Sequence, residues 1–482
     1  MLKYLSPAAL FPAAIAVGYG EPVWPFLLAG ALAAAAGQGL ELATRGKERV
    51  GVREGFLVVS LTWLVAAGFG ALPYLLSGED QLSSPLDAYF EAMSGFTTTG
   101  ATVLTDIEGL PRSLAMWRQF TQWLGGMGII VLALAILPRL RVGGRQLLEQ
   151  ELPGPEIEPL AASIRDTARR LWLLYIGLTA AEALALALLG WTGVDERMTP
   201  YEAVAHAFTT MPTGGFSTQA RSIEVFAAAS QWVMVVFMLI AGANFALTYR
   251  ALLRRQPRPA LRDEELRLYV GLLALGSLIL FLELSVEGLY AGEEAIRHAV
   301  VQTVSIMTTT GYASADYNVW TILAYITIVG LMFAGGSAGS TSGGIKVVRH
   351  LLIGKILRRE LRQTVHPELV MPVRLNGTIV DERTLRAVLA FVLLYMGLFG
   401  LGALGIVVDA ARTDVDVRAI DAIAAAASMI GNVGPALGFA GPMGSFEPFT
   451  DLSKGIMIVL MYAGRLEIIP LAVLLTRNYW RV

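Results

Sequence analysis

The sequence contains no cysteine and only four histidines among its 482 residues. Without cysteine there is no disulfide framework, no thiolate metal site and no thiol catalysis. The histidines lie far apart, and we find no HExxH, Walker A or Ser-His-Asp pattern. A membrane-embedded enzyme would need a catalytic dyad or metal ligands at depth, and we find neither. These absences argue against an enzyme.

Charged residues are also scarce. Asp, Glu, Lys and Arg make up 16% of the chain, whereas soluble domains carry about 25%. Hydrophobic residues make up 55%, and the mean hydropathy is +0.58. A formal net charge of -2 gives no reason to expect a nucleic-acid partner. The composition predicts an integral membrane protein in contact with lipid.

A membrane span needs about 20 mostly apolar residues. By this measure the sequence contains about ten candidate spans. We predict them at 4–19, 22–43, 55–77, 114–138, 169–191, 225–249, 267–290, 319–351, 384–409 and 451–476. Shorter apolar pieces lie at 84–96, 200–211, 295–308 and 418–430. We interpret these pieces as re-entrant half-helices, because they are too short to cross.

Basic residues cluster on one side of the predicted spans, at 45–53, 139–170, 254–262 and 346–362. The loops on the other side are mostly acidic, with Glu79, Asp80, Glu293, Asp414 and Asp416 among them. Cytoplasmic loops carry an excess of Lys and Arg. We therefore expect both termini in the cytoplasm and the ends of the half-helices in the outer half of the membrane.

Each half-helix ends in a small Thr/Gly motif without a carboxylate. The four motifs are "SGFTTTGATVL" from Ser94, "TTMPTGGFST" from Thr209, "IMTTTGYAS" from Ile306 and "MIGNVGPAL" from Met429. A helix break or a packing contact would explain one such motif, but four matching copies need one explanation. Irregular backbone at membrane depth must be buried in protein or line a water-filled cavity.

Thr and Gly suit a segment that turns its carbonyl oxygens toward an axis, since Gly adopts backbone angles that other residues avoid. A ring of backbone carbonyls can replace the hydration shell of K+. The partial negative charge at the C-terminal ends of the half-helices also favours a cation. The motifs therefore predict a cation filter.

The order span, half-helix, motif, span occurs four times. This predicts an all-α polytopic protein of four channel-like repeats around one central pore, preceded by a helix pair. The predicted division is 1–45 for the helix pair and 46–150, 151–258, 259–365 and 366–482 for the repeats.

Three further stretches complete a family pattern: "QWLGGMGII" at 122–130, "GGSAGSTSGGIKVVR" at 335–349 and "GRLEI" at 464–468. With the four motifs, they make the chain resemble the Trk/Ktr/HKT superfamily of K+ transporters over nearly its whole length. The leading helix pair makes it more similar to the bacterial TrkH-type membrane subunits than to the KtrB type. The resemblance implies a homodimer in the bacterial inner membrane with a cytoplasmic TrkA-like nucleotide-binding regulator.

By the resemblance, the transported ion is K+, with Rb+ as a surrogate, and no covalent cofactor is expected. The implied filter residues are Thr98, Thr99, Gly100, Thr213, Gly214, Gly215, Thr309, Thr310, Gly311, Asn432, Val433 and Gly434. In this family a serine in place of the first filter glycine goes with Na+ transport, so Gly100 favours K+. The fourth motif lacks threonine, so we expect only approximate fourfold symmetry.

The predicted span 319–351 contains a run of Gly and Ser, which form poor helix. Such a run fits a kink or a close helix crossing, or a flap below the filter. The resemblance implies an intramembrane gating loop, and our candidates there are Gly335, Gly336, Gly339, Gly343 and Gly344.

Arg465 lies in the last predicted span, where an arginine is costly and usually faces a partner or a cavity. It could pair with Glu467, bind a carbonyl of the loop, or lie near the membrane surface. The resemblance instead implies that it stands in the pore as a positive barrier beside the loop.

The alternative is a secondary transporter of another cation or of a small organic solute. Such transporters carry discontinuous spans in pairs and often intramembrane carboxylates. Four matched half-helices with neutral polar residues favour a bare cation instead. Whether flux is passive or coupled to H+ or Na+ by symport stays open.

Overall fold

The computed structural model describes residues 2–43, 52–135, 164–413, 415 and 417–481. The predicted boundaries at 45/46 and 150/151 lie outside the described residues. So do parts of the basic clusters at 45–53 and 139–170, and Asp414 and Asp416.

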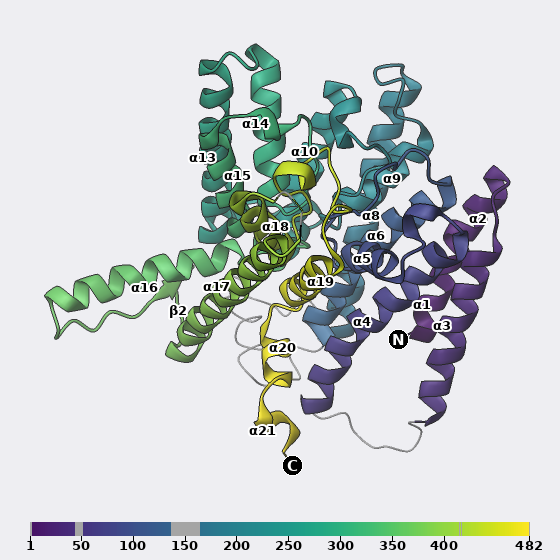
Figure 1. Ribbon diagram of the computed structural model, residues 1–482. Coiled ribbons are helices and arrows are strands. Elements are labelled where there is room, and N and C mark those ends of the chain that lie inside the picture. The colour runs from purple at the N-terminus through teal and green to yellow at the C-terminus, as the bar shows by residue number, and fades with distance from the viewer. Residues whose placement is uncertain (1, 44–51, 136–163, 414, 416, 482) are drawn as a thin grey trace.

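Most of the described chain is helical (Figure 1). A leading group of helices packs beside the rest and comprises α1 (Leu2–Leu5), η1 (Ser6–Ala9), α2 (Leu10–Tyr19) and α3 (Trp24–Ala43). The strands are β1 (Arg374–Leu375) and β2 (Thr378–Ile379), an antiparallel hairpin that pairs Arg374 with Ile379.

Four helix trios follow the leading group, each made of a long helix, a short helix and a third helix. Trio 1 is α4 (Val52–Ser77), α5 (Pro85–Phe96) and α6 (Arg112–Ala135), and trio 2 is α8 (Ile164–Trp191), α9 (Pro200–Thr210) and α10 (Ala228–Gly242). Trio 3 is α13 (Glu264–Val286), α14 (Gly292–Met307) and α15 (Ile322–Ala334), and trio 4 is α17 (Glu382–Ala410), α18 (Ala419–Gly431) and α19 (Asp451–Arg465).

Shorter elements connect the trios or follow them. They are η2 (Asp80–Leu82), η3 (Ser222–Val225), α11 (Phe245–Leu252), α12 (Arg258–Arg262), η4 (Tyr317–Val319), η5 (Gly438–Ala440), α20 (Ile469–Leu474) and α21 (Arg477–Trp480). The helix α16 (Val347–Val365) extends away from the body of the molecule in Figure 1.

The four short helices occupy the positions predicted for the half-helices. Local sequence explains where two of them begin. Helices α5 and α9 each have proline at their first position, where its missing N–H costs nothing. The Thr199 side chain accepts a hydrogen bond from Glu202 N, which caps α9.

The short helices form the centre of the molecule. Nearly every residue in the second half of each is buried. The third helix of each trio packs against the short helix of the next: α6 against α9, α10 against α14, and α15 against α18. Helix α19 packs against α5, so the fourth trio closes on the first. The trios therefore form a closed ring.

Five described helices are long and apolar enough to cross a membrane: Trp24–Ala43, Glu54–Ser77, Ala168–Trp191, Glu264–Val286 and Glu382–Ala410. Helices α10 and α11 together form one further candidate, bent by 113°. The chain is thus an all-helical membrane protein with several apolar spans, fewer of them continuous than we predicted.

Three predicted spans are broken, and each is a correction. The span 225–249 breaks where the Asn244 side chain caps α11 by accepting from Ala246 N. The span 319–351 is interrupted after Ala334, because residues 335–346 are irregular and the next helix, α16, begins at Val347. The span 451–476 ends its helix at Arg465, because left-handed backbone at 467–468 stops it.

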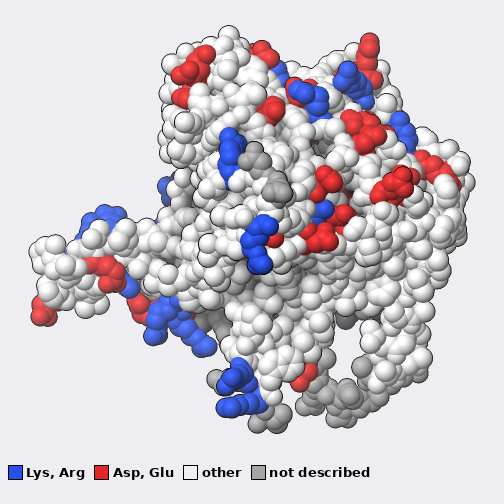
Figure 2. Space-filling model, viewed as in Figure 1, with Lys and Arg blue, Asp and Glu red and all other residues white. Residues whose placement is uncertain are grey.

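Charged side chains are unevenly distributed on the surface (Figure 2). Acidic side chains gather over the upper part of the view, with some basic ones among them, around a hollow. Basic side chains lie along the extension at the left that contains α16, with acidic ones among them, and at the C-terminal end at the bottom. A wide area of the lower right carries almost no charge.

A candidate ion filter and gate

The chain leaves the C-terminal end of each short helix with the same backbone conformation. We name the four stretches by residue: segment 1 is Thr98–Gly100, segment 2 Thr213–Gly215, segment 3 Thr309–Gly311 and segment 4 Asn432–Gly434. The first residues have φ of 51°, 55°, 59° and 54°, and the last, all glycine, have φ of 84°, 73°, 84° and 105°. The middle residues are not among those with positive φ.

Matching hydrogen bonds fix this conformation. In segment 1, Thr99 N donates to Ser94 O at 2.9 Å and Thr98 N donates to Gly95 O at 3.0 Å. The same two bonds, from the middle and first residues, occur in the other three segments. This is the Schellman ending of a helix, whose left-handed position usually holds glycine or asparagine. A β-branched threonine is strained there, so the surrounding structure must hold it in place.

The glycines that end the segments have no room for a side chain. A Cβ on Gly100 would overlap the carbonyl oxygen of Gly214 in the next segment. A Cβ on Gly215 would overlap Thr310 O, and one on Gly311 would overlap Val433 O. At Gly434 the nearest atom would be Thr99 O, 2.7 Å away. Each segment therefore touches the next in chain order, and the fourth touches the first.

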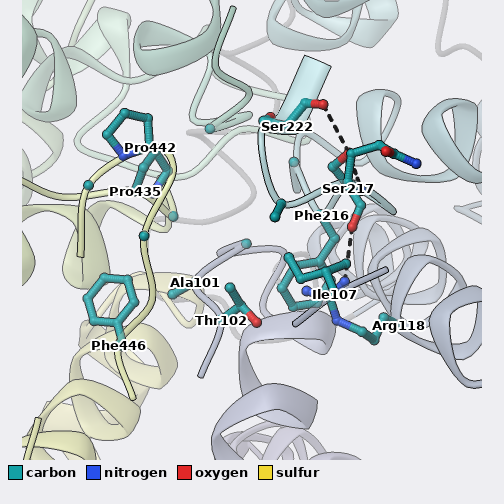
Figure 3. A pocket seen from close by; sticks show the side chains of 18 residues that line it. Ala101, Thr102, Ile107, Arg118, Phe216, Ser217, Ser222, Pro435, Pro442 and Phe446 are labelled. Carbon is teal, nitrogen blue, oxygen red and sulfur yellow. Dashed lines mark hydrogen bonds between the residues drawn. The ribbon is translucent and has the colours of Figure 1, made fainter. Parts of the chain in front are cut away.

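A cavity lies against this ring (Figure 3). All four glycines line it, and so do Ala101, Phe216 and Pro435, which follow three of them directly. Its volume is about 50 Å³, and one water needs about 10–15 Å³ on the same measure. The cavity can therefore hold a few water molecules or a partly hydrated ion.

Side-chain hydrogen bonds hold the ring together. Gln122 Nε2 donates to Gly214 O at 2.8 Å, and Phe216 N donates to Gln122 Oε1 at 3.1 Å. Asn432 Nδ2 donates to Thr99 Oγ1 at 3.0 Å and to Met461 O at 2.9 Å. Sequence reasoning missed the role of Gln122, although its position within "QWLGGMGII" was a signal.

The irregular stretch 335–346, which we call the loop, lies against the ring. Its Gly343 N donates to Thr309 Oγ1 at 2.7 Å, and its Thr341 Oγ1 donates to Met211 O at 3.0 Å. Ser337 N donates to Gly242 O at 2.8 Å, which fills the break after α10.

All five candidate glycines lie in the loop. Gly335, Gly339 and Gly344 have φ of 70°, 71° and 74°, where only glycine fits without strain. A Cβ on Gly336 would lie 2.8 Å from Gly242 O, and one on Gly343 would overlap Gly431 O.

Arg465 is buried, with 2% of its surface exposed. Its Nη1 donates to Thr341 O in the loop at 2.8 Å. Glu467 instead pairs with Arg349 at 2.5 Å. Among the described residues, Nε and Nη2 of Arg465 have no hydrogen-bond partner. The structure thus contains one of the contacts considered from the sequence, the hydrogen bond from Arg465 to a loop carbonyl.

The family model for the TrkH cation transport proteins matches residues 25–481. The chain belongs to the TrkH cation transport protein family. This confirms the resemblance, and with it the expectation that the chain is a transporter and not an enzyme.

Several relatives of known name align along most of the chain. The Trk system potassium uptake protein TrkH of Vibrio parahaemolyticus is 39% identical over 91% of this chain and 88% of that protein. TrkH of Escherichia coli K12 is 39% identical over 89% of this chain and 86% of that protein, and TrkG of the same strain is 35% identical over the same shares.

The crystal structure of the potassium transporter TrkH from Vibrio parahaemolyticus matches with a TM-score of 0.87 and 35% sequence identity. The match covers 100% of this chain and 97% of that one.

Proposed function

We propose that this TrkH-family chain is the membrane subunit of a Trk-type K+ uptake system, in which K+ passes through the ring of segments 1 to 4. The closed ring carries the proposal, since four closely similar backbone turns from distant parts of the chain meet around one cavity. The relatives named as potassium uptake proteins supply the ion.

The chemistry of the ring suits a cation stripped of water. The carbonyl oxygens of Thr99, Gly214, Thr310 and Val433 lie against the ring glycines. Such oxygens can replace the hydration shell of K+ without any carboxylate. The filter residues are those of segments 1 to 4, and the trios correspond to four repeats at 46–150, 151–258, 259–365 and 366–482 around one pore.

The loop and Arg465 form the gate in this proposal. The loop contacts segment 3 through Gly343, and Arg465 binds the loop through Thr341 O. The buried Arg465 guanidinium has two nitrogens without a hydrogen-bond partner among the described residues, and its positive charge there would oppose a cation.

The other parts of the proposal rest on the family resemblance and on the positive-inside rule. Both termini face the cytoplasm of a bacterium, and the protein spans its inner membrane as a homodimer. A TrkA-like nucleotide-binding subunit regulates it from the cytoplasm.

Flux through the purified protein in liposomes tests the proposal. We expect K+ and Rb+ to move down imposed gradients at least about tenfold faster than Na+ or Li+, since the ring discriminates by coordination. Equal K+ and Na+ flux would contradict a selective filter. If no cation moved even with the regulatory subunit and nucleotide present, a transporter of an organic solute would be the better reading.

A further inference from the structure

A fully buried ion pair lies beside the ring, and the proposed mechanism does not use it. Glu91 comes from the short helix α5 and Arg118 from α6. Arg118 Nε donates to Glu91 Oε1 at 2.7 Å, and the side chains are 1% and 0% exposed, respectively. Neither residue was a candidate from the sequence.

Glu91 holds the chain that leaves segment 1. Both of its carboxylate oxygens accept from the Thr102 hydroxyl, at 3.0 and 3.1 Å, and Oε2 accepts from Val103 N at 3.1 Å. Thr102 and Val103 follow Gly100 by two and three residues. Thr102 O in turn accepts from Phe446 N of trio 4 at 2.8 Å.

Arg118 holds the chain that leaves segment 2. Its Nη1 donates to Ser217 O at 3.1 Å, and its guanidinium lies 4.0 Å from the centre of the Phe216 ring. Phe216 and Ser217 follow Gly215 directly. Arg118, Thr102, Phe216 and Ser217 line the same cavity as the four glycines (Figure 3). The pair therefore joins the chains that leave segments 1 and 2.

The other trios place different residues at the position of Glu91, nine residues before the ring glycine: His206, Gln302 and Ala425. His206 Nε2 contacts Ser217 Oγ at 3.0 Å, and Gln302 Nε2 donates to Ala315 O at 3.4 Å. Both bind the chain that leaves their own segment, as Glu91 does. Of these four residues, Glu91 is the one that pairs with an arginine. That arginine, Arg118, comes from the next helix of the same trio and balances the carboxylate charge.

We propose that Glu91 and Arg118 are positioning residues that set the spacing of segments 1 and 2, and with it the preference for K+ over Na+. The inference rests on the proposed filter. Arginine can make both contacts at once because its guanidinium is a rigid planar fork that also stacks on an aromatic ring. Without this link the two segments can shift toward the smaller ion, and selectivity falls while conduction continues.

The decisive variant is Arg118→Lys, because it keeps the charge balance and removes the forked contact. We expect the ratio of K+ to Na+ flux in liposomes to fall about tenfold while K+ flux itself changes little. Glu91→Gln should lower the ratio at least as far, and K+ flux too, because it leaves the buried guanidinium unpaired beside the cavity.

Arg297→Lys is a matched control. Arg297 makes the same kind of double contact, with Nε donating to Glu293 Oε1 at 3.1 Å and Nη1 to Gln231 Oε1 at 2.7 Å, at the start of α14 and away from the ring. We expect it to keep the wild-type ratio.

A wild-type ratio in Arg118→Lys would overturn the positioning role, and so would an equal fall in all cation fluxes. If Glu91→Gln does not fold, Arg118→Lys decides alone. Wild-type protein in the same assay separates the two proposals. If wild type does not discriminate K+ from Na+, the proposed filter is wrong. If both wild type and Arg118→Lys discriminate equally well, only the role of the ion pair is refuted.

Discussion

Segments 3 and 4 have nearly the same backbone but share only one residue type. Their first residues have φ of 59° and 54°, and their glycines have φ of 84° and 105°. Thr310 N and Val433 N make the same hydrogen bond to the carbonyl five residues before, at 2.8 and 2.9 Å. The comparison teaches that the helix ending and the final glycine determine the ring's backbone, and that the threonine hydroxyls do not.

The side chains at the left-handed position then serve different purposes. Thr309 Oγ1 accepts from Gly343 N, so segment 3 contacts the loop. The Asn432 amide donates to Thr99 Oγ1 and Met461 O, so segment 4 is tied to segment 1. The fourth motif thus departs in sequence because it closes the ring.

The largest effect should come from serine at the ring glycines. We expect Gly311→Ser and Gly434→Ser each to lower the K+/Na+ flux ratio in liposomes at least about tenfold, since both glycines have φ that L-residues avoid. If only one of the two variants loses selectivity, the glycines of segments 3 and 4 do not play the same role. Gly271→Ser is the control, because a Cβ at Gly271 meets no atom within 4 Å.

Arg465→Ala should speed K+ flux several-fold without changing the ion preference, because it removes a positive charge next to the loop that segment 3 contacts. Stopped-flow or isotope flux into liposomes would measure this. Arg477→Ala, at an exposed site in α21, serves as the control. Unchanged or slower flux in the folded Arg465→Ala protein would contradict the gate.

Thr309→Val should raise K+ flux by a smaller factor, about twofold to fivefold. It keeps the β-branched shape and removes the acceptor of Gly343 N–H, and a hydrogen bond contributes about 1 kcal/mol. Thr327→Val is the matched control, since Thr327 is half-buried and its hydroxyl donates to Leu323 O of its own helix, away from the ring. A flux equal to that of wild type would mean that segment 3 does not hold the loop.

The smallest effect should come from Asn432→Thr, which gives segment 4 the residue of the other three. Threonine is strained in the left-handed region and lacks the amide donor, so the free energy of unfolding should fall by about 1–3 kcal/mol. Thermal unfolding in detergent measures this change. A variant as stable as wild type would show that the Asn432 contacts are dispensable.

The sequence by itself determined the class, the family and the place of each segment. Helical half-spans and their Thr/Gly endings depend on residues within a few positions, such as the capping Thr199 and Glu202 or the ring glycines. Hydropathy, capping and turn chemistry act over that range, so their signals are visible in one sequence.

Only the tertiary structure decided which spans break and which side chains meet. The hydrogen bonds of Ser337 with Gly242 and of Phe245 with Gly339 join the loop to the break after α10. Gln122 reaches Gly214 across 92 residues, and Arg465 reaches Thr341 across 124. No local pattern specifies such contacts, because they form when four trios close into a ring and buried polar groups must find partners there.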